Sequence, residues 1–403
     1  MNYASDFSRV TQTMKSSLIR ELVAATKSIP GLISFAGGFP SPATFPKQIL
    51  AELYREVITQ DGLDVLQYGA SDGDAVLKRE LVKWEGYDIS ANQMMTTVGA
   101  TNAIYYYALS LLDPGDVVIC EAPSFLGTLV ALDALQAELV SVPIDNDGIS
   151  LEHLEAAVRS CKAAGKKIKF IYTIPDFHNP GGVTMSMQRR RDLLNFAIEH
   201  QLPILEDNPY SRLRFDGKPL PTLYRLMRQE FTGSEIVTEV VSFSKILGPG
   251  MRIAFVKGEA SLLQKMESWQ QKVNVTPDCV SQRVAARFLA DGFMEPHLQS
   301  VCEHYKPYLR KMLDCLEAYM PKGVSWTRPQ GGIFVWMELP EHQNADEIFH
   351  AAAQNKVSFI PGSKFYPAGQ ERFNTLRLNF TYSSLDQIDT GIQRLAELLK
   401  ALA

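Results

Sequence analysis

Residues 203–210 read PILEDNPY and residues 236–245 read IVTEVVSFSK, and these two stretches decide the fold class. Each opens with a short apolar or β-branched run, as buried strands do, and ends in polar side chains. Similar runs stand at residues 116–120, 169–173 and 252–257. Helical patterns lie between most of them, and this alternation predicts βαβ units that build a mostly parallel sheet.

The stretches between these runs carry apolar residues at helical spacing. One example follows Ser186, a suitable N-cap, and has apolar residues at Leu193, Leu194, Ala197 and Ile198. Helices of this kind cover the faces of a parallel sheet, so the sequence predicts an α/β three-layer sandwich. Near the C-terminus, Ser384 and Gln387 form a possible capping box ahead of another apolar stripe. We interpret that last helix as closing a second, smaller α+β domain.

The length of 403 residues exceeds what one hydrophobic core usually supports, so we expect two domains. The composition, with 46% hydrophobic and 21% charged residues, is that of an ordinary globular protein. We predict an N-terminal arm that also contributes to the small domain (1–45), a large domain (46–290) and a small C-terminal domain (291–403).

Charge and cysteine usage exclude several classes of protein. The net charge of −5, without a basic surplus, argues against nucleic-acid binding. The five cysteines are odd in number and far apart, so neither disulfides nor a metal site is expected. Residues 1–20 lack the apolar core of a signal peptide, and no stretch reaches the roughly 20 apolar residues of a membrane span. We therefore expect a cytoplasmic protein with reduced thiols, no metal and no membrane partner.

Polar clusters follow four of the predicted strands. Because the carboxyl ends of parallel strands share one edge of a sheet, and ligands bind outside that edge, these clusters mark the expected site. They are EAPSF (121–125), PDFHNPGG (175–182), EDNPY (206–210) and SFSK (242–245).

With these clusters the chain resembles the fold type I, class I/II aminotransferases that depend on pyridoxal 5'-phosphate (PLP). It is most similar to the subgroup of 2-aminoadipate and broad-specificity aromatic and branched-chain aminotransferases. The resemblance covers nearly the whole chain, because further motifs stand in the family order. They are SFAGG (34–38), LQY (66–68), GAT (99–101), PGMR (249–252), RPQGGIFVW (328–336), PG (361–362) and LRL (376–378).

The resemblance implies three catalytic residues. Lys245 would hold PLP as a Schiff base and then shuttle protons, because nearby cations and burial push its amine toward the neutral form. Asp207 would face the pyridine nitrogen and keep it protonated, so that the ring acts as an electron sink. Tyr210, together with Asn179, would donate hydrogen bonds to the phenolic oxygen of the cofactor.

The resemblance also implies how the rest of PLP is held. Backbone N–H groups of Gly99, Ala100 and Thr101, ahead of a helical run, suit a phosphate group. The resemblance also implies cofactor contacts from the hydroxyl-bearing Ser242 and Ser244 and from the charged Arg252. Phe125 would stack on the ring of the cofactor. In this family a partner tyrosine reaches the phosphate, and Tyr68 matches it, which implies a homodimer with shared sites.

The substrate would be an L-amino acid that passes its amino group to a 2-oxo acid, such as 2-oxoglutarate, in a ping-pong reaction. Arg377 has the planar fork that suits a carboxylate, and would bind the α-carboxylate with help from Asn179 and the Gly38 backbone. Arg20 is similar to an arginine of the 2-aminoadipate relatives that meets a distal carboxylate. It would let the site accept both acidic and apolar side chains.

Other interpretations stay open at this point. Arg20 and Arg377 could be surface arginines, and Phe125 could be ordinary core packing. The same cofactor also serves β-lyases, decarboxylases and oxidases, and a PLP-binding sensor domain is a further alternative. His178 stands where the subgroup usually has glutamine, and Gly182 follows Gly181 where the pair Thr-Gly is frequent. We interpret His178 as a hydrogen-bonding neighbour of Asn179, and Trp326, Phe334 and Trp336 as packing of a small-domain sheet.

Overall fold

The computed structural model describes residues 3, 6–13 and 29–402, so Arg20 lies outside the described residues. Its main element is an eight-stranded sheet with strand order β2-β9-β8-β7-β6-β3-β4-β5. Neighbouring strands from β4 through β3, β6 and β7 to β8 are parallel, whereas β9 and β5 run antiparallel to their neighbours. The strands are β2 (Met94–Val98), β3 (Val117–Ala122), β4 (Glu138–Asp145), β5 (Gly148–Ile149), β6 (Ile168–Thr173), β7 (Ile204–Asn208), β8 (Val237–Ser242) and β9 (Ile253–Lys257).

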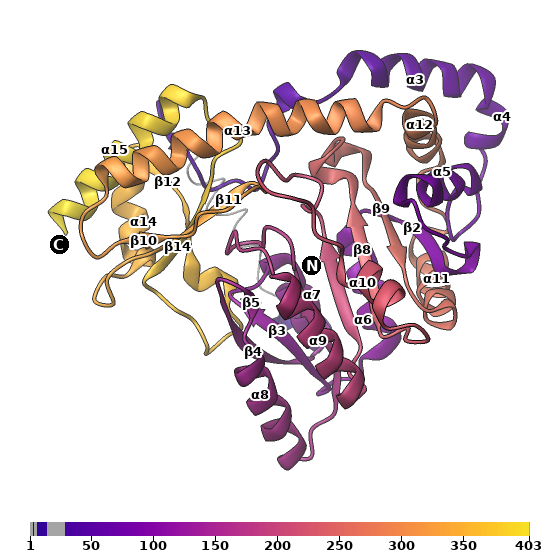
Figure 1. Ribbon diagram of the computed structural model, residues 1–403, viewed down its shortest axis with the longest axis horizontal. Coiled ribbons are helices and arrows are strands. Elements are labelled where there is room, and N and C mark those ends of the chain that lie inside the picture. Colours follow the sequence, from indigo (N-terminus) through magenta and orange to yellow (C-terminus); the bar gives the residue numbers. More distant parts are fainter. Residues whose placement is uncertain (1–2, 4–5, 14–28, 403) are drawn as a thin grey trace.

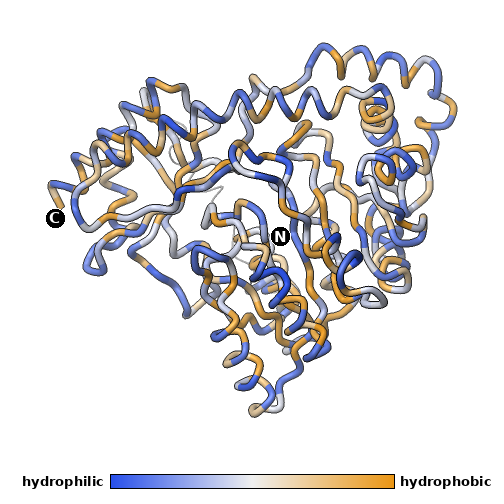
Figure 2. The backbone as a smooth tube through the Cα atoms, viewed as in Figure 1, coloured by the Kyte–Doolittle hydropathy of each residue, from blue (hydrophilic) through white to orange (hydrophobic). Residues whose placement is uncertain are grey.

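Helices cover both faces of this sheet, as Figure 1 shows. Alternate residues of a strand point to opposite faces, so Val118 and Cys120 pack in one core and Val117 and Ile119 in another. The first core includes α6 (Ala100–Leu111), α7 (Leu126–Ala134) and α11 (Ala260–Asn274). The second includes α8 (Leu151–Ala163), α9 (Met187–His200) and α10 (Leu223–Glu230). In Figure 2 the strands are mostly apolar and the outer helix faces polar, which confirms the predicted three-layer α/β sandwich.

A smaller sheet lies at the other end of the molecule, beside the C-terminus (Figure 1). Its order is β10-β11-β14-β13, and a separate pair joins β1 to β12, so the N-terminal segment packs with the C-terminal part. The strands are β1 (Ile33–Ser34), β10 (Ser325–Trp326), β11 (Phe334–Glu338), β12 (Val357–Ser358), β13 (Ile360–Pro361) and β14 (Thr375–Asn379). The domain boundaries at residues 45 and 290 stay a prediction.

The remaining helices surround these sheets and connect them. Helix α13 (Met294–Tyr319) runs from the large sheet to the small one and packs on α15 (Leu385–Ala401). The capping box of Ser384 and Gln387 at the start of α15 is confirmed. The others are α1 (Arg9–Thr13), α3 (Lys47–Gln60), α4 (Gly62–Val65), α5 (Ala75–Glu85), α12 (Cys279–Ala290) and α14 (Ala345–Gln354). Among the described residues, no helix combines the length and the apolar character that a membrane crossing requires.

Candidate active site

The polar ends of β3, β6, β7 and β8 meet at the carboxyl edge of the large sheet, beside a cavity of about 650 Å³. The structure brings most of the residues predicted from the sequence into the wall of this cavity. They are Gly38, Ala100, Thr101, Phe125, Asn179, Asp207, Tyr210, Ser242, Ser244, Lys245, Arg252 and Arg377. Gly99 lies directly behind the wall, against Arg252, whereas Tyr68 is exposed and does not line the cavity of its own chain.

Lys245 ends a 3₁₀ turn that follows β8, and the Ser242 hydroxyl caps this turn by accepting a hydrogen bond from the Ser244 N–H at 3.2 Å. The Lys245 Nζ donates to the Gly38 carbonyl oxygen at 2.6 Å. Lys245 lines the cavity, and the burial of its amine, with the charges of Arg377 and Arg252, lowers the pKa of Lys245 to about 8. The amine can therefore lose its proton near neutral pH, as a nucleophile or a base requires.

Asp207 lies at the end of β7 and is buried. Its Oδ2 accepts a hydrogen bond from the Tyr172 hydroxyl at 2.7 Å, and Tyr172 in turn accepts one from Thr128 at 2.9 Å. Burial is the main reason why the pKa of Asp207 is raised to about 6. Its Oδ1 is buried with no hydrogen-bond partner among the described residues, which is unusual in a folded protein. An unpaired carboxylate oxygen that faces a cavity fits the protonated ring nitrogen of PLP.

The start of α6 is a second part of the site that fits PLP, because the first N–H groups of the helix have no partner within it and attract anions. Gly99 is the N-cap, with a φ of 79° that favours glycine. A Cβ on Gly99 would lie 2.3 Å from Nη2 of Arg252, so a side chain at this position would displace the guanidinium from the helix start. Backbone N–H groups and one cation at the same place suit the PLP phosphate.

Arg377 lies on β14, and its buried guanidinium hydrogen-bonds to neutral groups. Its Nη1 donates to the Asn179 side-chain oxygen and its Nη2 to the Ala36 carbonyl, each at 2.9 Å, while Nε has no partner among the described residues. Burial lowers the pKa of Arg377 to about 10, which still leaves it charged at neutral pH. A buried cation that has only neutral partners here suits an anionic substrate group.

Two sequence interpretations need correction. His178 does not bond to the Asn179 side chain: its Nδ1 accepts from the Gly181 N–H at 3.1 Å, and its Nε2 lies 3.1 Å from the buried Glu121 carboxylate. No role was assigned to Glu121 from the sequence, although its place at the end of a predicted strand, in β3, was visible there. Phe334 packs in β11 as expected, but its ring also lines the cavity, 4.0 Å below the Arg377 guanidinium.

The fold and the site together define a PLP-dependent enzyme of fold type I. The family model described as aminotransferase class I and II matches residues 30–395, and the chain belongs to this family. An aromatic-amino-acid aminotransferase of Thermococcus litoralis is 38% identical, over 99% of this chain and 95% of its own. A 2-aminoadipate transaminase of Thermus thermophilus is 34% identical, over 100% and 98% of the two chains.

A solved structure gives the same result for the fold. The kynurenine aminotransferase of Pyrococcus horikoshii superposes with a TM-score of 0.94 at 36% identity, covering 100% of this chain and 98% of the other. When bound, PLP supplies an electron sink that allows an amino group to be exchanged between an amino acid and a 2-oxo acid. The protein is therefore a PLP-dependent aminotransferase that acts on amino acids and 2-oxo acids.

Proposed function

We propose that this aminotransferase uses 2-aminoadipate, aromatic or branched-chain L-amino acids as donors and 2-oxoglutarate as an acceptor. The observation that carries this proposal is the mixed character of the cavity. Arg377 offers a buried cation for the α-carboxylate, whereas Phe39, Leu126 and Val130 line the cavity with apolar side chains. Apolar walls favour aromatic and branched side chains. The names of the two similar aminotransferases agree with aromatic amino acids and 2-aminoadipate as substrates.

In this proposal each residue acts through the contact that the structure gives it. Arg377, held by Asn179, orients the substrate through its α-carboxylate, with the Gly38 backbone alongside. Lys245, whose amine can be neutral near pH 8, holds and moves the proton at the reacting carbon. Asp207 stabilises positive charge at the ring nitrogen through its unpaired Oδ1, and Tyr210 would donate a hydrogen bond to the phenolic oxygen of the cofactor.

A substrate panel tests this proposal. Holoenzyme mixed with glutamate, 2-aminoadipate, phenylalanine or leucine should lose the visible absorbance of the lysine-bound cofactor and gain that of its amine form. Adding 2-oxoglutarate should reverse the change. Release of ammonia without a 2-oxo acid would instead indicate a lyase, and no spectral change with any donor would indicate a sensor. Reaction with glutamate alone would contradict the broad substrate range.

We further propose a cytoplasmic homodimer with shared active sites. Tyr68 is 78% exposed, and Leu63 and Leu66, close to it in sequence, and Val273 and Val275, on either side of Asn274, are exposed as well. Leu66 and Tyr68 share one hollow with Asn274. Apolar side chains gathered in this way are typical of a subunit interface. All five cysteines are free, which agrees with a reducing compartment.

Mixing two defective variants tests the shared site. If Tyr68 serves the partner's cavity, a hybrid of Lys245→Ala and Tyr68→Ala subunits contains one site with both native residues. Activity at limiting PLP should therefore rise when the two inactive homodimers exchange subunits. If Tyr68 served its own chain, every hybrid site would lack one residue, and mixing would restore nothing. Measurement of the rate before and after subunit exchange distinguishes the two cases.

A further inference from the structure

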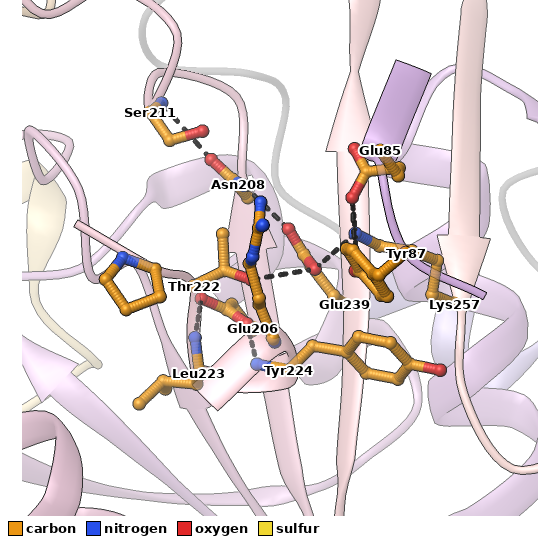
Figure 3. A network of polar contacts seen from close by, with 12 residues as sticks. Glu85, Tyr87, Glu206, Asn208, Ser211, Thr222, Leu223, Tyr224, Glu239 and Lys257 are labelled. Atoms are coloured by element: carbon orange, nitrogen blue, oxygen red, sulfur yellow. Dashed lines mark hydrogen bonds and ion pairs between the residues drawn. The ribbon is translucent and has the colours of Figure 1, made fainter. Parts of the chain in front are cut away.

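A network of buried polar side chains lies behind the turn that carries Tyr210 (Figure 3). Its centre is Lys257 of β9, which is fully buried and contacts the carboxylates of Glu85 and Glu239. The distance from Lys257 Nζ to Glu239 Oε2 is 2.7 Å, and the Tyr87 hydroxyl is 2.9 Å away. We call Glu85, Lys257 and Glu239 the anchor cluster. It joins the end of α5 to β8, which neighbours β7, and to β9 on the other side of β8.

Asn208 connects the anchor cluster to the active-site turn. Its Nδ2 donates to Glu239 Oε1 at 2.7 Å, and its Oδ1 accepts from the Ser211 N–H at 3.2 Å. Asn208 directly follows Asp207, and the loop it closes contains Tyr210. The Asn208 amide thus makes one hydrogen bond within the turn and one to the neighbouring strand β8.

The far side of the same turn is held by the anchor cluster as well. Arg212 places Nη2 3.4 Å from Glu85 Oε1, and its guanidinium lies 4.4 Å above the ring of Trp84. The Leu213 N–H donates to the Tyr210 carbonyl at 2.7 Å. Tyr210 therefore stands in a turn that is fixed at both ends, while its own ring is buried and lies edge-on to Phe334.

Stability alone is a poor explanation for this arrangement. The desolvation of buried charges offsets much of their attraction, so apolar side chains of the same size often stabilise a fold equally well. Hydrogen bonds to charged groups are directional, and they fix the orientation of an amide such as that of Asn208. The two carboxylates hold Lys257 in its charged form, because they raise its pKa by more than burial lowers it.

We propose that Asn208 is a positioning residue for Tyr210: its amide, oriented by the anchor cluster, fixes the turn that aims the Tyr210 hydroxyl into the cavity. Asn208 itself does not line the cavity, so it acts only through the residues beside it. This inference rests on the role proposed above for Tyr210, as a donor to the phenolic oxygen of PLP.

Three variants with two measurements test the proposal: Asn208→Ala, Tyr210→Phe and the control Tyr54→Phe. The control removes a hydrogen bond of 2.8 Å between α3 and α12. The first measurement is the dissociation constant of PLP from the apoprotein, read from its fluorescence. The second is the pH midpoint of the visible absorbance of the holoenzyme. A phenol that donates to the ring oxygen stabilises negative charge there, so losing it raises this midpoint.

Asn208→Ala is expected to raise the midpoint in the same direction as Tyr210→Phe, and to weaken PLP binding about tenfold, the effect of one lost hydrogen bond to a charged group. Tyr54→Phe should change neither. If Asn208→Ala only lowers the melting temperature, the network is merely structural and the proposal is wrong. If Tyr210→Phe leaves the midpoint unchanged, the role of Tyr210 fails, and this inference fails with it.

A second pair of variants covers the case in which Asn208→Ala does not fold. Asn208→Asp keeps the acceptor for Ser211 but places a carboxylate against Glu239, so the midpoint and the PLP affinity should change as in Asn208→Ala. When Glu239→Gln is added to Asn208→Asp, the new amide at position 239 can donate to the carboxylate at position 208, so the native hydrogen bond is restored in the opposite direction. The PLP affinity and the midpoint should then recover in part. No recovery in the double variant, or no change in the single one, would overturn the proposal.

Discussion

Replacing Lys245 by alanine is expected to lower the rate of amino transfer by about 10⁴-fold or more, because one side chain supplies both the nucleophile and the base. Its Nζ faces the cavity, and its lowered pKa, about 8, leaves a usable fraction of neutral amine at neutral pH. Nothing else in the described cavity wall is a lysine, so no neighbouring amine can take over. Single-turnover rates with glutamate measure the effect.

Variants at two lysines test whether this effect is specific to the amine of Lys245. Lys245→Arg keeps a positive charge near the Gly38 carbonyl, but a guanidinium does not lose its proton at neutral pH, so it should be as inactive as Lys245→Ala. Lys306→Ala removes a half-exposed lysine that pairs with Asp216 at 2.9 Å, and should leave the rate unchanged. A Lys245→Ala enzyme within tenfold of the native rate would contradict the assignment.

Asp207→Asn should lower kcat/KM by about 10² to 10³-fold, the effect of removing one preorganised charge from a site closed to water. The substitution keeps the size of the side chain, and the Tyr172 hydroxyl can still donate to the amide oxygen. What changes is the unpaired Oδ1, which loses its negative charge or is replaced by a donor. Steady-state kinetics and the PLP dissociation constant measure the two consequences.

The pH dependence of PLP binding gives an independent check. Burial raises the pKa of Asp207 to about 6 in the protein without cofactor, so the carboxylate is charged above that pH and neutral below it. A positively charged ring nitrogen prefers the charged carboxylate. The affinity should therefore be full above pH 6 and fall as the pH drops below it. Glu121 and His178 lie close to Asp207 and are still present in the Asp207→Asn variant. A loss of PLP affinity at acid pH that occurs in the native protein but not in this variant is therefore due to Asp207. An identical fall in both proteins would contradict the assignment.

The sequence predicted the large sheet well, but not completely. The five apolar runs in the sequence correspond to β3, β6, β7, β8 and β9 within two residues at each end; they are residues 116–120, 169–173, 203–206, 236–242 and 252–257. β4 was not predicted, because this strand lies near the sheet edge, is half-exposed and contains Pro143, which weakens its pattern. β2 was also not predicted; its pattern, MMTTV, lacks the alternation of apolar and polar residues that marks a half-buried strand.

Side-chain partners were predicted less well than backbone elements. His178 was expected beside Asn179, since the two are adjacent in sequence, yet its ring contacts Glu121 from β3. Lys257 was read only as the end of a strand, although it proves to be a buried cation between two carboxylates. Contacts between residues far apart in the chain leave no local pattern in a single sequence.

By itself the sequence determined five strands of the large sheet, that the sheet is mostly parallel, and that Asp207 and Lys245 stand at the ends of two of these strands at one edge. Hydrophobic periodicity and turn residues are local properties, so they can be read along the chain. Only the tertiary structure decided which Asp207 oxygen stays unpaired, that Arg377 comes from a second sheet, and that Asn208 meets Glu239. Those facts depend on the strand order and on packing between elements, which distant residues settle together as the chain folds.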